Sequence, residues 1–133
     1  MLFYLLIWIL WYYIKIMRNT IKKHKDFLIG EQDINARCAM FFVRARPARI
    51  SDDPQYGLIV TKKIFKLAVN RNRAKRMLRD WIRYNEKNMC ADMDYIFIAR
   101  MPILATTRTD GRAAMRRALH YIKKQNAAKN TEK

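Results

Sequence analysis

Glycine, cysteine, histidine and acidic residues are scarce in this sequence, and their scarcity excludes most kinds of active site. The three glycines lie too far apart to form a phosphate-binding loop, and there is no nucleophile elbow and no set of carboxylates spaced for a nuclease metal site. Cys38 and Cys90 have no histidine or second cysteine at metal-ligand spacing, which argues against a zinc site or a disulfide framework. The sequence therefore predicts no catalytic residue and no metal site in the protein itself.

Acidic residues are outnumbered by lysine and arginine, 11 to 28, which gives a formal net charge of +17 and a field that attracts polyanions. A disordered basic tail would need low hydrophobicity, whereas 51% of these residues are apolar. The length fits one packed domain, and the cysteines are expected to be reduced thiols, as in the cytoplasm. We therefore expect one folded, cytoplasmic domain with nucleic acid as its leading partner and an anionic membrane as the second.

The first sixteen residues differ from the rest, because "MLFYLLIWILWYYI" carries no charge. A spanning helix needs about 20 apolar residues, and a secretory signal would have a basic segment before the apolar run and a small-residue cleavage site after it. Two interpretations remain: a membrane-contacting extension, or translation from a start codon upstream of Met17. We favour the second, because Met17 opens the charged sequence directly. The expected organisation is an apolar extension at 1–16, one domain at 17–126 and a polar tail at 127–133.

Apolar periodicity in the remaining sequence predicts both helices and strands. Residues 19–30 fit a short helix capped by Asn19 or Thr20, and residues 37–46 fit an alternating strand. One face of that strand would carry Ala39, Phe41, Val43 and Ala45, and the other Met40, Phe42, Arg44 and Arg46. Further strands are expected at 57–63 and 94–100, and a final helix at 109–125 with Ala114, Leu119, Tyr121 and Ile122 available for packing.

The segment 68–86 is both strongly basic and regularly apolar. At 100° per residue, Asn72, Arg76, Arg79 and Arg83 fall within about 60° of one another. The apolar residues Leu67, Ala74, Met77, Leu78, Trp81 and Ile82 centre on the opposite side. A solvated face usually interleaves acids with bases, and like charges one turn apart repel. The unrelieved row therefore indicates a polyanionic partner, and arginine suits bidentate phosphate contacts.

These residues resemble the protein component of bacterial ribonuclease P. The resemblance rests on "GLIVTKK", "AVNRNRAKRMLRDWIR" and "DYIFIAR", in this order, with the RNRxKR signature supplied by residues 71–76. The upstream "KKHKDF" is similar to the family's first helix and "MFFVRAR" to its first strand, so the likeness covers about residues 20 to 124. The family has no apolar run before its first helix, which supports a start at Met17.

The resemblance implies a small single-domain α+β sandwich with the order helix, strands, helix, strand, helix. The signature helix would form a βαβ crossover between parallel strands. Such crossovers are usually right-handed. By resemblance this one is expected to be left-handed, as in the second domain of a small-subunit ribosomal protein to which the family is related.

The resemblance also implies an accessory subunit of an endoribonuclease that removes the 5′ leader of precursor transfer RNA. The RNA subunit would perform the chemistry and hold most of the Mg²⁺ ions, while the protein would add affinity and position the substrate. Its partners would be ribonuclease P RNA and precursor transfer RNA, with no small-molecule substrate. The RNA subunit would be contacted by Lys62, Lys63, Arg71, Asn72, Arg73, Lys75, Arg76, Arg79 and Arg83. Arg71 and Arg73 lie off the row, so their inclusion rests on the motif.

A second surface is expected to bind the leader, formed by Phe27 of the first helix with Phe42, Arg44 and Arg46 on the open face of the strand. Bases of a single strand can stack on aromatic rings while the backbone follows the cations. Ordinary core packing is the alternative for Phe27 and Phe42, and it is the favoured interpretation for Phe41.

Two other functions remain open at the level of sequence. A structural RNA-binding protein of ribosomal type would have the same charge and a similar fold, but it would not activate a processing RNA. A membrane-anchored basic protein would use residues 1–16 and place the cationic face on anionic lipid. A native N-terminus at Met17 would remove most of the support for that second alternative.

Overall fold

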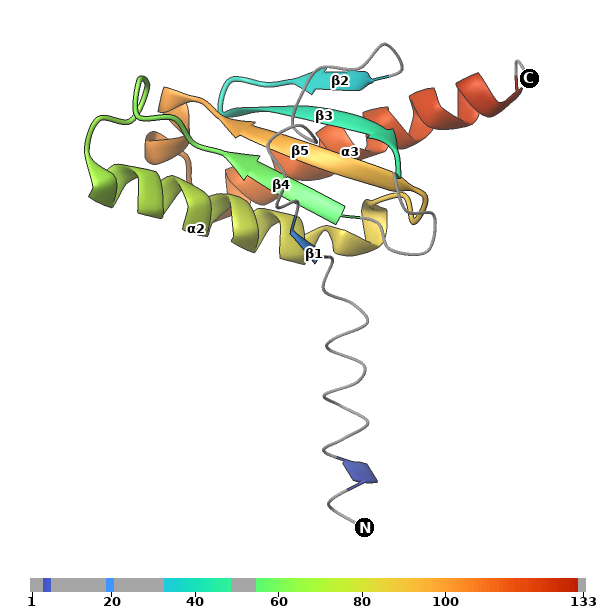
Figure 1. Cartoon of the computed structure of the whole chain (residues 1–133), viewed down its shortest axis with the longest axis horizontal. Coiled ribbons are helices and arrows are strands. Elements are labelled where there is room, and N and C mark those ends of the chain that lie inside the picture. Colours follow the sequence, from blue (N-terminus) through green and yellow to red (C-terminus); the bar gives the residue numbers. More distant parts are fainter. Residues whose placement is uncertain (1–3, 6–18, 21–32, 49–54, 132–133) are drawn as a thin grey trace.

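In the part of the chain that the structure describes, two helices pack on one face of a single mixed sheet (Figure 1). The computed structural model describes residues 4–5, 19–20, 33–48 and 55–131, and within these segments the strand order is β1-β4-β5-β3-β2. The elements are β1 (Asn19–Thr20), β2 (Ile34–Arg37), β3 (Phe41–Pro47), β4 (Gln55–Ile59), α2 (Ala68–Tyr84), β5 (Met93–Ala99) and α3 (Arg108–Thr131), with 3₁₀ turns at Glu86–Asn88 and Met101–Ala105. The predicted α+β class is confirmed.

The strand predicted over 37–46 is in fact the turn and second strand of a hairpin. β2 and β3 are antiparallel, with Arg37 opposite Phe42, and Cys38 N–H donates to the Phe41 carbonyl at 3.0 Å across the turn. The predicted alternation holds along β3, where Phe41 is fully buried and Phe42 is only half-buried. Ala39, expected on the core face, is exposed because it lies in the turn.

The predicted βαβ unit is present, with α2 connecting the parallel strands β4 and β5. The left-handedness of this crossover stays a prediction. β4 ends at Ile59, so the strand expected over 57–63 is two residues out of place at its start and four too long at its end. Lys62 lies in a turn instead, where its side chain is exposed. β5 is the central strand and is buried along almost its whole length.

The N-terminal expectations are tested only in part. Asn19 and Thr20, predicted as a helix cap, instead form β1 and pair in parallel with β4. The helix expected after them, with Phe27, lies outside the described residues, as does most of the segment 1–16. No helix in the described segments is long and apolar enough to cross a membrane.

The final helix is longer than predicted at its C-terminal end. It was expected to end at Gln125, but α3 continues to Thr131. The additional turns contain Ala127 and Ala128, which are strong helix formers, so local propensity extends the helix into a polar sequence. At the other end the Thr107 hydroxyl accepts the N–H of Asp110 at 3.2 Å, which caps the first turn.

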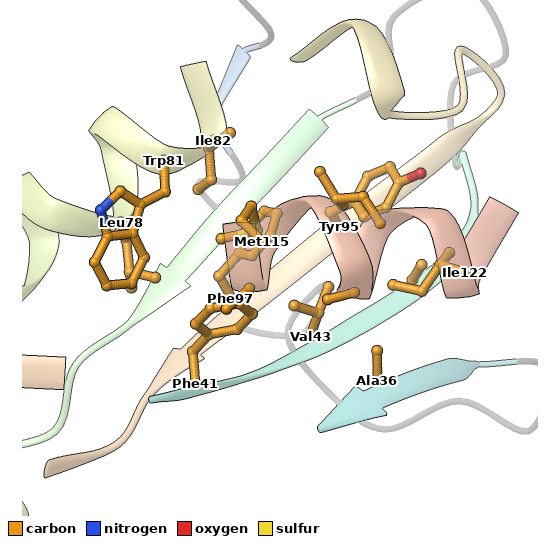
Figure 2. Packing of buried hydrophobic residues seen from close by; sticks show 14 of the residues in the cluster. Ala36, Phe41, Val43, Leu78, Trp81, Ile82, Tyr95, Phe97, Met115 and Ile122 are labelled. Atoms are coloured by element: carbon orange, nitrogen blue, oxygen red, sulfur yellow. The ribbon is translucent and has the colours of Figure 1, made fainter. Parts of the chain in front are cut away.

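The core lies between the two helices and the sheet (Figure 2). Trp81 is 1% exposed and lies with its ring centroid 6.1 Å from that of Phe41 on β3. Two predicted core residues do not belong to it. Leu67 is 62% exposed because it precedes the helix in an extended conformation. The helical periodicity used for the prediction therefore does not apply to it. Tyr121 is 49% exposed and lies on the outer side of α3.

The two helices meet tightly at a contact that we call the α2–α3 seam, formed by Asp80, Trp81, Asn85, Gly111 and Arg112. A Cβ atom on Gly111 would overlap the Trp81 ring, so glycine is required here by packing rather than by backbone conformation. The amide of Asn85, which is 2% exposed, donates to the carbonyls of Trp81 and Arg112, each at 3.0 Å. The seam fixes the start of α3 against the end of α2.

Gly111→Ala is expected to lower the free energy of unfolding, by about 1–3 kcal/mol, because the added methyl group overpacks the seam. Replacing glycine by alanine inside a helix normally stabilises it by about 1 kcal/mol, so the sign of the effect is diagnostic. Urea unfolding followed by circular dichroism measures it. Lys123→Ala, on the exposed side of the same helix, is the matched control and should change stability by less than about 0.5 kcal/mol. A stabilised Gly111→Ala variant would contradict the tight seam.

Candidate nucleic-acid interface

The outer face of α2 carries the predicted row of cations. Ala74, Leu78, Trp81 and Ile82 are buried against the sheet and α3. The row residues Asn72, Arg76, Arg79 and Arg83 are all exposed. The prediction that one face docks and the opposite face is cationic is therefore confirmed.

Around this row the remaining motif residues differ in exposure. Arg73 is exposed and Lys75 is half-buried at the flank of the helix. Lys62 and Lys63 are exposed in the turn that leads into α2. Val69 lies one turn before the first residue of the row and is 69% exposed. It adds an apolar surface at the N-terminal end of the row. Whether these residues contact RNA stays a prediction.

The one acidic residue of α2, Asp80, is neutralised by α3 and does not relieve the row. Its carboxylate accepts from Arg112 Nε at 3.2 Å and from Arg112 Nη2 at 3.1 Å, a bidentate geometry, and Arg108 Nε lies 3.8 Å away. The Arg112 guanidinium also stacks on the Tyr84 ring, 4.2 Å from its centroid. The charge of Asp80 is thus used to join the helices.

The same arrangement brings an additional cation to the row. A shallow groove is lined by Arg73, Arg76, Arg79 and Arg83 from α2 and by Arg108 from the first turn of α3. Arg108 is 74% exposed at its side chain and was not predicted. No local pattern around it could have shown this, because its position beside α2 depends on the docking of the two helices.

Arg71 has a structural role that the motif did not indicate. Its Nη1 donates to the carbonyl oxygens of Phe65 at 2.9 Å and Lys66 at 3.0 Å, which lie in the segment between β4 and α2. Those carbonyls precede the helix and have no partner within it. Arg71 therefore braces the entry into α2, from a position on the helix that lies off the exposed row.

A second surface lies on the sheet face away from the helices. Phe42 is outside the buried hydrophobic cluster, and the guanidinium carbons of Arg37 and Arg44 lie 5.2 and 5.7 Å from its ring centroid. Arg44 is 11% exposed at its side chain and pairs with Asp33 at 3.6 Å. Arg46 is half-buried on the same face of β3. The structure thus groups Phe42 with Arg44 and Arg46, while Phe27 lies outside the described residues.

Arg37 is a member of this surface that the sequence did not predict. It lies directly opposite Phe42 in the β2–β3 pairing, and it is exposed. Recognition of the hairpin would have been needed to find it, because the prediction treated residues 37–46 as one strand. Arg44, by contrast, is held between Asp33 and the Phe42 ring, so it orients the ring more than it offers free charge.

A fold of this kind, with a cationic helix and a separate aromatic surface on its sheet, defines a small basic α+β domain suited to polyanions. The family model for ribonuclease P matches residues 17–123, so the chain belongs to the ribonuclease P protein family. The ribonuclease P protein component of Chromobacterium violaceum is 35% identical over 89 residues, which cover 67% of this chain and 69% of that relative. That of Pseudomonas entomophila is 49% identical over 49 residues, only 36% of its own length.

Solved structures agree with this assignment. The RNase P protein of Staphylococcus aureus superposes with a TM-score of 0.67 at 27% identity, covering 80% of this chain and 97% of that one. The RNase P protein of Thermotoga maritima gives a TM-score of 0.65 at 24% identity, covering 78% and 97%, and supports the fold alone.

Arg71 braces the entry into α2, whereas Arg79 belongs to the exposed row, and substitutions at the two positions should affect stability differently. Arg71→Ala is expected to lower the free energy of unfolding by about 1–3 kcal/mol, because two carbonyls lose their partner at the entry to α2. Arg79→Ala removes an exposed side chain of the row and should change it by less than about 0.5 kcal/mol. Chemical denaturation of both variants is the measurement. Equal stabilities for the two would show that Arg71 does not brace the turn.

Proposed function

We propose that this chain is the protein subunit of ribonuclease P, which binds the catalytic RNA and the 5′ leader of precursor transfer RNA and thereby assists 5′-end maturation. The observation that carries the proposal is the outer face of α2. Four guanidinium groups on α2 and that of Arg108 line one groove, while the one acid of the helix is engaged by α3. Such an array is costly in a free protein and is relieved by a polyanion.

The row is suited to phosphates rather than to base edges. From Asn72 to Arg83 it extends about 16 Å along the helix at 1.5 Å per residue, with successive members about one turn apart. Contacts of this type give affinity and fix orientation but carry little sequence information. Each one releases counterions, so the logarithm of the binding constant should fall with the logarithm of salt by about 0.7–0.9 per phosphate. We assign this surface to the catalytic RNA.

The Phe42 surface is assigned to the leader. A half-buried ring close to two guanidinium groups is restrained in orientation before any ligand arrives, which reduces the entropy lost on stacking. Stacking of a base on an aromatic ring is worth about 1–3 kcal/mol and is tolerant of sequence. Arg46 lies on the same strand as Phe42 and would contact the phosphate backbone of the leader. Phe27 is proposed as a second ring on which a base of the leader stacks.

The chemistry is assigned to the RNA subunit together with most of its Mg²⁺ ions. The described residues contain no group of three or more His, Cys, Asp or Glu side chains that could hold a metal ion. The chain's own part is then to add affinity and to hold the substrate. A cytoplasmic location belongs to the same proposal.

The decisive experiment is precursor transfer RNA cleavage by a bacterial ribonuclease P RNA at low Mg²⁺, with and without the protein. Strong activation that releases an intact 5′ leader is expected. Arg76→Glu should weaken binding to the catalytic RNA at least tenfold and reduce its salt dependence, because it removes a phosphate contact and adds repulsion. Lys129→Glu, with the same charge change at the far end of α3, should change binding less than threefold.

A wild-type protein that binds RNA tightly but does not activate cleavage would contradict the proposal. It would favour a structural RNA-binding protein instead. An equal loss of affinity in both charge-reversal variants would show that net charge, rather than the row on α2, determines binding.

Phe42→Ala is expected to weaken holoenzyme binding to precursor transfer RNA by about 5- to 100-fold and to leave binding of mature transfer RNA unchanged, because only the precursor has a leader to stack. Phe42→Tyr keeps the ring and is the matched control. Affinities measured by competition for both RNAs give the ratio. Equal losses for precursor and mature RNA, in a variant that remains folded, would overturn the assignment of this surface.

A further inference from the structure

The outer face of α3 is a charged surface that the proposed function leaves unused. The side of α3 that faces the sheet carries Gly111, Ala114, Met115, Ala118, Leu119 and Ile122, all buried. On a helical wheel the opposite side, together with the flank toward β2 that carries Tyr121, holds a set of exposed residues that we call the α3 face: Arg116, Arg117, His120, Tyr121 and Lys124. This division explains why Tyr121, predicted to pack, is instead open to solvent.

The α3 face is unlike an ordinary solvated helix surface. From Gly111 to Thr131 there is no acidic residue, although the segment contains six lysines and arginines. Arg116 and His120 lie one turn apart, as do His120 and Lys124, and the helix places no acidic side chain between them. An exposed face designed only for solubility mixes both signs. The α3 face therefore has the electrostatic character already argued for α2.

The α3 face is also hollowed, and it carries an aromatic ring, that of Tyr121, on its flank toward β2. Two shallow hollows meet at Arg117 and Tyr121. One is lined by these residues with Ala113, Arg116, His120 and Lys124. The other extends to the edge strand β2, where Arg37 and Asn35 form its far wall. Neither hollow has an acidic residue among its described lining residues. Tyr121, 49% exposed, offers a ring on which a base can stack.

Arg37 connects this face with the Phe42 surface. Its guanidinium carbon lies 5.2 Å from the Phe42 ring centroid on the open side of the sheet, and the same residue lines the hollow beside Tyr121. β2 is the last strand of the sheet, so a chain lying on Phe42 can pass over this edge without crossing another strand. Cations and rings thus continue from one side of the domain to the other.

We infer that the α3 face binds the distal part of the 5′ leader of precursor transfer RNA, after the leader has passed over β2 at Arg37. A base stacks on Tyr121, and phosphates contact Arg117 and Lys124. The inference rests on the proposed function, because it extends the leader path beyond Phe42. Its occupant is a single-stranded RNA, since stacking on one exposed ring needs an unpaired base.

The test is the affinity of the holoenzyme for precursor transfer RNAs whose leaders are shortened one nucleotide at a time. Tyr121→Ala is expected to weaken binding of long leaders by roughly 5- to 100-fold and to have no effect below a threshold length. Tyr121→Phe keeps the ring and should bind like the wild type. Arg117→Ala with Lys124→Ala should lower the salt dependence by about 0.7 per lost contact, again for long leaders only.

Two results would overturn the inference. One is an unchanged affinity of the Tyr121→Ala holoenzyme at every leader length. The other is an equal loss for long leaders, short leaders and mature transfer RNA, which would place the face on the catalytic RNA or on the transfer RNA body. Failure of the proposed function is distinct from both, because the wild-type protein would then fail to favour precursor over mature RNA at any leader length.

Discussion

The close contact between Trp81 and Gly111 is the constraint on which both helices depend. It lets α3 approach α2 so nearly that Arg112 can form a bidentate pair with Asp80, and the buried amide of Asn85 can bond to carbonyls of both helices. Without this approach Asp80 would remain within the groove as an uncompensated acid. The packing of Trp81 on Gly111 therefore affects the charge of the groove on α2. It brings Arg112 to Asp80, so that the negative charge of Asp80 is paired within the seam.

Two acidic residues of the described segments serve fixed structural purposes. Asp80 joins the helices, and Asp33 holds Arg44 against Phe42. Both acids therefore position cationic or aromatic groups rather than neutralise the exposed surface. The sequence has only 11 acidic residues against 28 lysines and arginines. Because these two acids are engaged elsewhere, the outer faces of α2 and α3 carry basic residues without acidic neighbours on the same face. The aromatic surface and the cationic helix then lie on different sides of the sheet.

Helix α2 was predictable from sequence because its two faces follow a single period, and that period fixes both the core residues and the exposed row. The features that were missed depend on contacts between elements. The sequence pattern did not reveal the β2–β3 hairpin, because its three-residue turn lies within a continuous β-rich run. For this reason the position of Arg37 beside Phe42 could not be predicted. Arg108 joins the groove only when α3 docks. Arg71 could be included through the motif, but its bonds to the carbonyls of Phe65 and Lys66 depend on how the chain enters the helix.

The unpaired row on α2 also bears on how long the free chain would survive in a cell. Like charges one turn apart raise the free energy of the folded state until a polyanion neutralises them. A polyanion that binds only the folded chain lowers that free energy by mass action. Chains made in excess over RNA would then unfold more often and reach proteases sooner. Under the proposed function, the supply of RNA would in this way influence the abundance of the protein.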